Sequence, residues 1–246
     1  MSIDCKWNWH NTGHQVWYDD ETFETLENTY PLQFYDDFLG VAGGSAFGTT
    51  ETWNVVVTAG ADTSEIIGDS ANGLFRLHIH ATGEDEDAVL YHGDNRNFDM
   101  SNGVIFEACL TMTTLPTLGT RGVVGMAGNT AADKDALLES AWFKWSGSGA
   151  VLVETDDTEN ETSNVATGVT CVAGTYNIYR IDFTTLADTK FFIDGVRVCD
   201  STTFDMSALA GAELILQPYF SFDKATPNEG VGDMDIDYVK ILSNRS

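Results

Sequence analysis

The spacing of hydrophobic and polar residues predicts a chain built mainly of β-strands. In the stretch 73–82, Phe75, Leu77 and Ile79 alternate with polar side chains, which puts the three apolar residues on one face. A period of two residues is the signal of a half-buried strand. The same alternation recurs in 103–112, 176–183, 189–198, 214–222 and 234–241. The apolar face that we expect to be buried in the second stretch carries Val104, Phe106, Ala108, Leu110 and Met112.

Turn-forming residues refine the later strands. Asp194-Gly195 separates two runs that are rich in β-formers, and such a pair supplies the positive φ angles of a tight hairpin turn. Pro218 has no backbone N–H, so it predicts an edge position or a bulge for its strand. In the last stretch the alternation places three residues on one face: Met234, Ile236 and Tyr238.

Helical signals are scarce, and only 131–145 could hold a short helical turn ahead of a strand. Many short strands separated by turn signals are typical of two packed antiparallel sheets. The pattern therefore predicts an all-β fold, a two-sheet antiparallel β-sandwich. We expect one domain over residues 34–246, because no second core and no linker is visible after residue 40.

Residues 1–33 differ from the rest of the chain and are predicted to form an N-terminal arm with one or two short strands. Trp7, Trp9, Trp17 and Tyr18 stand there among acidic residues with poor alternation. Aromatic side chains are enriched at protein interfaces, so these four are candidate partner-binding residues. The alternative is that they pack back onto the sandwich.

The net charge limits the choice of partners. The 246 residues carry 12 Lys and Arg against 38 Asp and Glu, a formal charge of −26. Binding to nucleic acid or to an anionic membrane needs clustered cations, so neither is expected. No run approaches the roughly 20 apolar residues of a membrane span. The N-terminus has no apolar stretch behind a basic one, so we expect no signal peptide and folding in a cytoplasm.

Four cysteines, Cys5, Cys109, Cys171 and Cys199, are widely spaced and form no CxxC pair. In a reducing compartment they are expected to be free and mostly buried thiols. If they were oxidised, three pairings would be open.

The sharpest chemical motif is the run from Glu154 to Glu159. Its E-x-D-x-x-E spacing, with Asp156 in the middle, resembles that of laminarinase-like retaining glycoside hydrolases. Such enzymes need one carboxyl group as nucleophile and a second as acid/base, about 5–5.5 Å apart. Here the intervening residues are polar rather than apolar, and the run continues into 160–164 with further polar residues. We therefore expect a solvated turn and no enzymatic activity, with Glu154, Asp156 and Glu159 as weak catalytic candidates.

Two candidate metal sites follow from the strand pattern. His78 and His80 share one strand face, which suits zinc or copper but lacks an evident third ligand; an exposed polar face is the simpler interpretation. Acidic residues also occur near the first sandwich strand, at 36–37, and on the last one, at Asp235 and Asp237. If these strands are neighbours, carboxylates from both could face one calcium ion.

Several stretches resemble a known family. YNIYRIDF, KFFIDGVRV and DIDYVKI are similar to the later strands of concanavalin A-like, laminin-G-like jelly rolls, and the resemblance spans about 34–243. More narrowly, 87–112, 179–198 and 216–225 followed by 237–241 resemble bacteriophage-encoded virion proteins. The resemblance implies a jelly roll, one calcium ion near Asp37 and Asp237, and no catalytic residue.

Three functions remain open. The first is a non-enzymatic capsid decoration or cement protein on the virion surface, synthesised in the host cytoplasm and bound to viral capsid protein and to copies of itself. The second is a lectin-like module that binds a surface glycan. The third is the laminarinase-like glycoside hydrolase. A fold cannot separate the three functions, because one fold hosts many.

Overall fold

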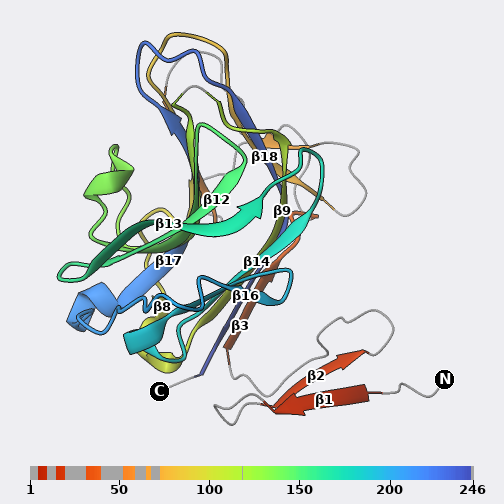
Figure 1. Ribbon diagram of the computed structural model, residues 1–246, viewed down its shortest axis with the longest axis vertical. Helices are drawn as coiled ribbons and strands as arrows, with labels where there is room; N and C mark the ends of the chain where they lie inside the picture. The colour runs from red at the N-terminus through yellow and green to blue at the C-terminus, as the bar shows by residue number, and fades with distance from the viewer. Residues whose placement is uncertain are drawn as a thin grey trace.

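The protein folds as two antiparallel sheets packed face to face, as predicted. The computed structural model describes residues 5–9, 15–19, 32–39, 52–58, 65–67, 73–117 and 119–244 (Figure 1). Within these residues the helices are short 3-10 turns, η1 (Met100–Asn102), η2 (Lys134–Ala136), η3 (Leu186–Asp188) and η4 (Gly211–Leu214). No helix in the described ranges has the length and apolar character needed to cross a membrane.

Each sheet has eight strands. Sheet I has the order β13 (Glu161–Thr170), β12 (Ala150–Asp157), β11 (Glu139–Ser146), β10 (Arg121–Ala127), β17 (Ile215–Lys224), β7 (Glu86–Tyr91) and β4 (Asn54–Thr58), and β8 (Phe98–Asp99) also pairs with β17. Sheet II has the order β16 (Val196–Val198), β15 (Lys190–Ile193), β14 (Asn177–Asp182), β9 (Ile105–Thr114), β18 (Gly232–Ser243), β6 (Phe75–Ile79) and β5 (Glu65–Ile66), and β3 (Leu32–Asp36) also pairs with β18.

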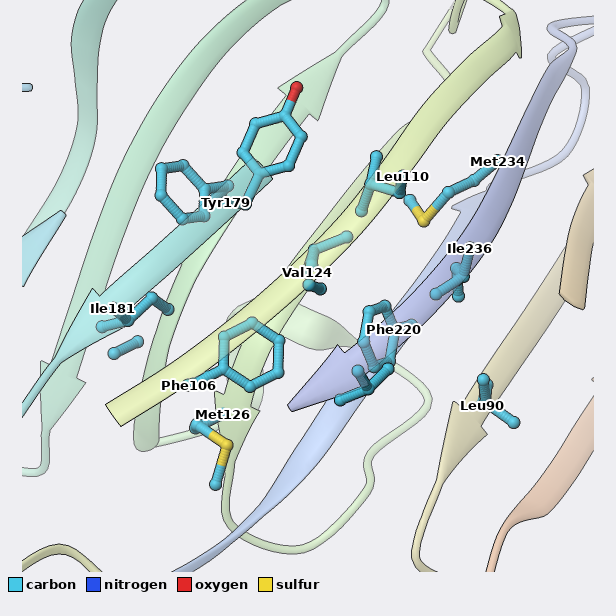
Figure 2. Packing of buried hydrophobic residues seen from close by; sticks show 14 of the residues in the cluster. Leu90, Phe106, Leu110, Val124, Met126, Tyr179, Ile181, Phe220, Met234 and Ile236 are labelled. Carbon is cyan, nitrogen blue, oxygen red and sulfur yellow. The ribbon is translucent and has the colours of Figure 1, made fainter. Parts of the chain in front are cut away.

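The core lies between the sheets and is filled by the apolar faces that alternation predicts. Phe106 and Leu110 of β9 meet Val124 of β10 and Phe220 of β17 there (Figure 2). The five residues from Val104 to Met112 expected on one face are all buried in this core. Phe75, Leu77 and Ile79 of β6 are buried as well. Because side chains alternate, the intervening residues of each strand lie on the outer faces of the sandwich.

The hairpin prediction is confirmed. β15 and β16 pair across Asp194 and Gly195, whose φ angles are 49° and 74°. The short helical turn expected within 131–145 is the 3-10 turn η2, which precedes β11.

Two local predictions are wrong. Pro218 lies in β17, an interior strand between β10 and β7, rather than at an edge. On the side of β17 away from β10, residues 215–216 pair with β8 and residues 219–224 pair with β7. Pro218 lies between these two pairings, so its missing N–H breaks no ladder on that side. In β18 a register shift between Ile236 and Tyr238 inserts an extra residue, so Tyr238 leaves the face of Met234 and Ile236.

The N-terminal arm contains a separate two-stranded sheet. β1 (Cys5–Trp9) pairs with β2 (Gln15–Asp19), so that Trp7 lies opposite Trp17 in the register. Figure 1 shows this hairpin beside the sandwich rather than within either of the two large sheets. Sandwich pairing itself begins with β3 at Leu32, two residues before the expected domain boundary.

Candidate functional site

The run from Glu154 to Glu159 is not the solvated turn that its polarity suggested. Its first part belongs to β12, a strand flanked on both sides in sheet I. Val151 and Val153 fill the core from this strand, so the alternation sends Glu154 and Asp156 to the outer face. Even there Glu154 is only 6% exposed. The prediction failed because Glu154 finds its partners on the neighbouring strand, where local polarity gives no sign of them.

Glu154 is held by two side chains of β11. Lys144 Nζ lies 2.7 Å from Glu154 Oε2, and Trp142 Nε1 donates to Oε1 over 3.3 Å. Both Lys144 and Trp142 are buried. A buried carboxylate needs a counter-charge and hydrogen bonds, and this arrangement supplies them. Glu154 is therefore a neutralised part of the face rather than a free nucleophile.

The second half of the motif is structural. Asp157 is fully buried and accepts the backbone N–H groups of Glu159 at 3.2 Å, Asn160 at 2.6 Å and Ala208 at 2.8 Å. These bonds fix the turn between β12 and β13. Glu159 is exposed in that turn, beyond the end of β12. The structure thus places Glu154 and Asp156 side by side on one face and leaves Glu159 outside their cavity.

The cavity beside Glu154 has a volume of about 200 Å³ and polar walls. It is lined by Lys134, Leu137, Lys144, Glu154, Asp156, Glu161, Ser163 and Asn164. Asp156 and Glu161 lie directly opposite each other in the β12–β13 register. Burial raises the pKa of Asp156, and the charges of Glu161, Asp157 and Glu154 raise it further, against a backbone N–H that lowers it. The cavity combines carboxylate, amide, hydroxyl and ammonium groups.

The segment 128–138 covers the part of the outer face of sheet I over β7, β10 and β17. Lys134 from this segment is fully buried, 2.8 Å from Asp87 Oδ2 and over the ring of Tyr219. Thr130 Oγ1 lies 3.0 Å from the Tyr219 hydroxyl. Beneath the segment is a second apolar cluster: Val89, Tyr91, Val123, Ala127, Leu137, Trp142 and Tyr219. We call this outer side of sheet I the covered face.

The two tryptophans nearest the motif do not form an exposed aromatic platform. Trp142 belongs to the covered cluster and is 1% exposed. Trp145 points into the main core, where its Nε1 lies 3.3 Å from Cys171 Sγ. Sequence reasoning missed Lys134 and Lys144. A signal for Lys144 was available, because a lysine between Phe143 and Trp145 on a strand lies on the opposite face from both.

The arm residues are placed by their backbone pairing. Trp7 and Trp9 lie on β1, and Trp17 and Tyr18 on β2. Trp7 is opposite Trp17, while Tyr18 is opposite Lys6. The surroundings of the four aromatic side chains lie outside what the structure describes.

The expected calcium ligands come from neighbouring segments, because β3 pairs with β18. Burial raises the pKa of Asp237, and the charge of Asp37 raises it further, against a hydrogen bond from Cys109 that lowers it. Asp235 is occupied by a bidentate pair with Arg76 at 2.6 and 2.7 Å. The described residues thus offer two carboxylates, whereas calcium takes six to eight oxygen ligands. Across the described ranges, no group of three His, Cys, Asp or Glu side chains is arranged to hold a metal.

The histidine pair lies on the outer face of sheet II. The rings of His78 and His80 are 4.2 Å apart, and His78 Nδ1 bonds Asp233 Oδ1. Asp233 also accepts the hydroxyl of Thr114. Of the cysteines, Cys109, Cys171 and Cys199 are free thiols, and the side chain of Cys5 is outside the described part.

The comparisons with known proteins extend this description. No protein-family model matches the chain, and no curated protein matches it. A β-1,3-glucanase from Mycobacterium marinum has a similar structure, with a TM-score of 0.56 and 15% identity over 88% of this chain and 100% of that one. The Emp47p carbohydrate recognition domain has a TM-score of 0.55 and 8% identity over 87% of this chain and 95% of that one. A carbohydrate esterase of the Shiga toxin-encoding bacteriophage phi24B has a TM-score of 0.50 and 13% identity over 88% of this chain and 99% of that one. At these identities the likeness shows the fold alone. The chain is a jelly-roll β-sandwich of concanavalin A-like type.

Proposed function

We propose that the protein is a non-enzymatic structural protein of a phage virion, attached to the outer shell through its N-terminal arm. The observation that carries this proposal is the hairpin of β1 and β2, which forms its own sheet outside the sandwich. A two-stranded hairpin alone is marginally stable in water. With Trp7, Trp9 and Trp17 on its strands, it gains most by burying aromatic area against a partner.

The sandwich supports the structural half of the proposal. It has its own continuous core, so it can fold without the arm. The net charge of −26 keeps free subunits soluble and makes them repel one another. Attachment through buried aromatic anchors suits such a chain better than attachment through charge attraction.

The state of Glu154 supports the absence of hydrolysis. A retaining glycosidase needs a free carboxylate nucleophile and a second carboxyl group close by. Glu154 is paired with Lys144 at 2.7 Å, and Glu159 lies in the turn beyond the strand. We therefore expect no release of reducing sugar from β-1,3-glucan by the purified chain. Turnover that Glu154→Gln abolishes would contradict this part of the proposal.

The attachment can be tested with purified particles that lack the protein. Wild-type chain added back should bind to saturation, and mass spectrometry should give its copies per capsid. The double variant Trp7→Ala/Trp9→Ala should bind at least about tenfold more weakly, because interfacial tryptophans often contribute 2 kcal/mol or more each. Unchanged occupancy by this variant would contradict attachment through the arm.

A second candidate function, glycan binding, is favoured by the cavity of about 200 Å³ at β11–β13. Its Asp156, Ser163 and Asn164 offer the hydroxyl-binding groups that a sugar requires. Two of the similar structures, the Emp47p carbohydrate recognition domain and the phage carbohydrate esterase, are carbohydrate proteins by name, and a third is a β-1,3-glucanase. A glycan array with Asn164→Ala as the matched variant tests it, and binding that this variant leaves unchanged would remove the cavity as the site.

A further inference from the structure

The outer face of sheet II carries a continuous row of side chains across six strands. In the strand registers Tyr35 of β3 is opposite Lys240 of β18, Lys240 is opposite Glu107 of β9, and Glu107 is opposite Arg180 of β14. Arg180 is opposite Phe192 of β15, which is opposite Arg197 of β16. Five strand spacings give the row a length of roughly 24 Å. We call this outer side of sheet II the open face.

The open face holds three cations that form no ion pair with any residue that the structure describes, although Glu107 is opposite both Arg180 and Lys240 in the register and Asp182 is opposite Lys190. Most Lys and Arg side chains within the described ranges form ion pairs: Arg76, Arg121, Lys134, Lys144, Arg197 and Lys224. Over residues 73–117 and 119–244 the exceptions are Arg96, Arg180, Lys190 and Lys240. Three of these four lie on the open face, although acidic groups outnumber basic ones 38 to 12 in the chain. Chance pairing would make unpaired cations rare in so acidic a protein.

Aromatic rings accompany these cations. The guanidinium carbon of Arg180 lies 4.1 Å from the ring centroid of Phe192. A cation over an aromatic ring is attracted to it, and the Nε of Arg180 finds no hydrogen-bond partner within the described part of the chain. At the other end of the row Tyr35 is 59% exposed, with its ring 5.9 Å from that of Tyr238. The row thus combines aromatic rings with three positive charges, and one carboxylate, Glu107, lies between Lys240 and Arg180.

We propose that the open face binds an acidic polysaccharide, with Arg180 and Lys240 taking carboxylate groups and Phe192, Tyr35 and Tyr238 contacting sugar rings. Arg180 and Lys240 are two strand spacings apart, roughly 10 Å. A polymer with sparse charges fits that spacing. Nucleic acid carries one charge per about 1.7 Å of duplex, which is far denser than two cations roughly 10 Å apart can match, so the spacing disfavours it.

An acidic peptide fits the open face less well. Extended peptides bind by adding a strand to an exposed sheet edge. The row runs across sheet II from β3 to β16 rather than along an edge, and the sheet's described outer strands, β16, β5 and β3, have only three, two and five residues. A saccharide needs no strand edge, because it binds through ring faces and point charges.

Binding of an acidic polysaccharide is a second property beside attachment to the shell. It is tested on the purified full chain without particles, so polysaccharide binding and shell attachment can each fail while the other holds. Binding is measured by calorimetry at 0.15 M salt, where the Debye length of about 8 Å limits the general repulsion. We expect the wild type to bind polygalacturonate and not neutral dextran. Arg180→Gln/Lys240→Gln should weaken binding at least about tenfold, since both lost contacts are charge-assisted.

The matched control is Arg96→Gln, which removes a cation that forms no ion pair in the described ranges and lies away from this face. It should change the affinity less than about twofold, as screening predicts for a distant charge. Lys240→Gln alone leaves the Arg180–Phe192 stack intact and should still weaken binding if the double variant folds poorly. Absence of polygalacturonate binding by the wild type, or an equal loss in Arg96→Gln, would overturn the proposal. Equally tight binding of polyglutamate would overturn it in favour of an acidic protein segment.

Discussion

The covered face of sheet I and the open face of sheet II differ in how they treat charge. On the covered face Lys134, which belongs to the segment 128–138, is buried against Asp87. Lys144 of β11 is buried against Glu154. On the open face Arg180, Lys190 and Lys240 are partly exposed and form no ion pair with a described residue, although Arg180 lies over the ring of Phe192. The face that carries the E-x-D-x-x-E run thus neutralises its buried lysines and keeps a cavity of about 200 Å³ beside Glu154, whereas the other face leaves these three cations outside ion pairs with the described part of the chain.

The largest expected effect comes from breaking the pair on the covered face. Lys144→Met leaves the carboxylate of Glu154 buried without a counter-charge, and removing one partner of a buried pair typically costs 3–5 kcal/mol. We expect a loss of about this size in the free energy of unfolding, measured by urea denaturation. The double variant Lys144→Met/Glu154→Gln should recover most of it.

The matched change on the open face is Lys240→Gln, which should alter the free energy of unfolding by no more than about 0.5 kcal/mol. If Lys144→Met and Lys240→Gln lowered the free energy of unfolding equally, the proposed difference between the two faces would be wrong.

The third prediction concerns the candidate calcium site at Asp37 and Asp237. If Asp37 and Asp237 bind one calcium ion, calcium at 100 times its dissociation constant should add about 2.7 kcal/mol of stability, and EDTA should remove it. Asp237→Asn should lose the response in thermal melts, whereas Asp200→Asn, at an exposed position, should keep it. A melting temperature indifferent to calcium and EDTA would remove this site.

One pH response should come from the end of β7 in sheet I. His92 follows that strand, and burial lowers its pKa to about 4, against a hydrogen bond with Asn97 that raises it. The unfolded chain therefore takes up this proton first, and stability is lost as the pH falls below 6.5 toward 4. Between pH 6.5 and 5 the loss should be about 2 kcal/mol at 1.36 kcal/mol per unit.

The control for this titration is His92→Gln. This variant should lose the part of the pH dependence that His92 causes, even if its stability differs from that of the wild type. An identical pH dependence in wild type and His92→Gln, followed by denaturant unfolding at each pH, would contradict the assignment.

Much of the fold was predictable because strand alternation is a local signal. The buried faces of β6 and β9 and the Asp194-Gly195 turn followed directly from it. Tyr238 was misplaced because one extra residue in β18 reverses the alternation without leaving a mark in composition. Glu154 was misplaced because its burial depends on Lys144 in another strand. The row on the open face was equally hidden, since it exists only in the registers of six strands.

The measurement that tests the account most directly is deletion of residues 1–31, which keeps β3 and the whole sandwich. Circular dichroism and thermal melting should show a folded domain, because the core lies between sheets I and II. Added to particles that lack the protein, the truncated chain should leave them undecorated at concentrations where the full chain saturates them. Full occupancy by the truncated chain, or its failure to fold, would contradict a self-sufficient sandwich attached through its arm.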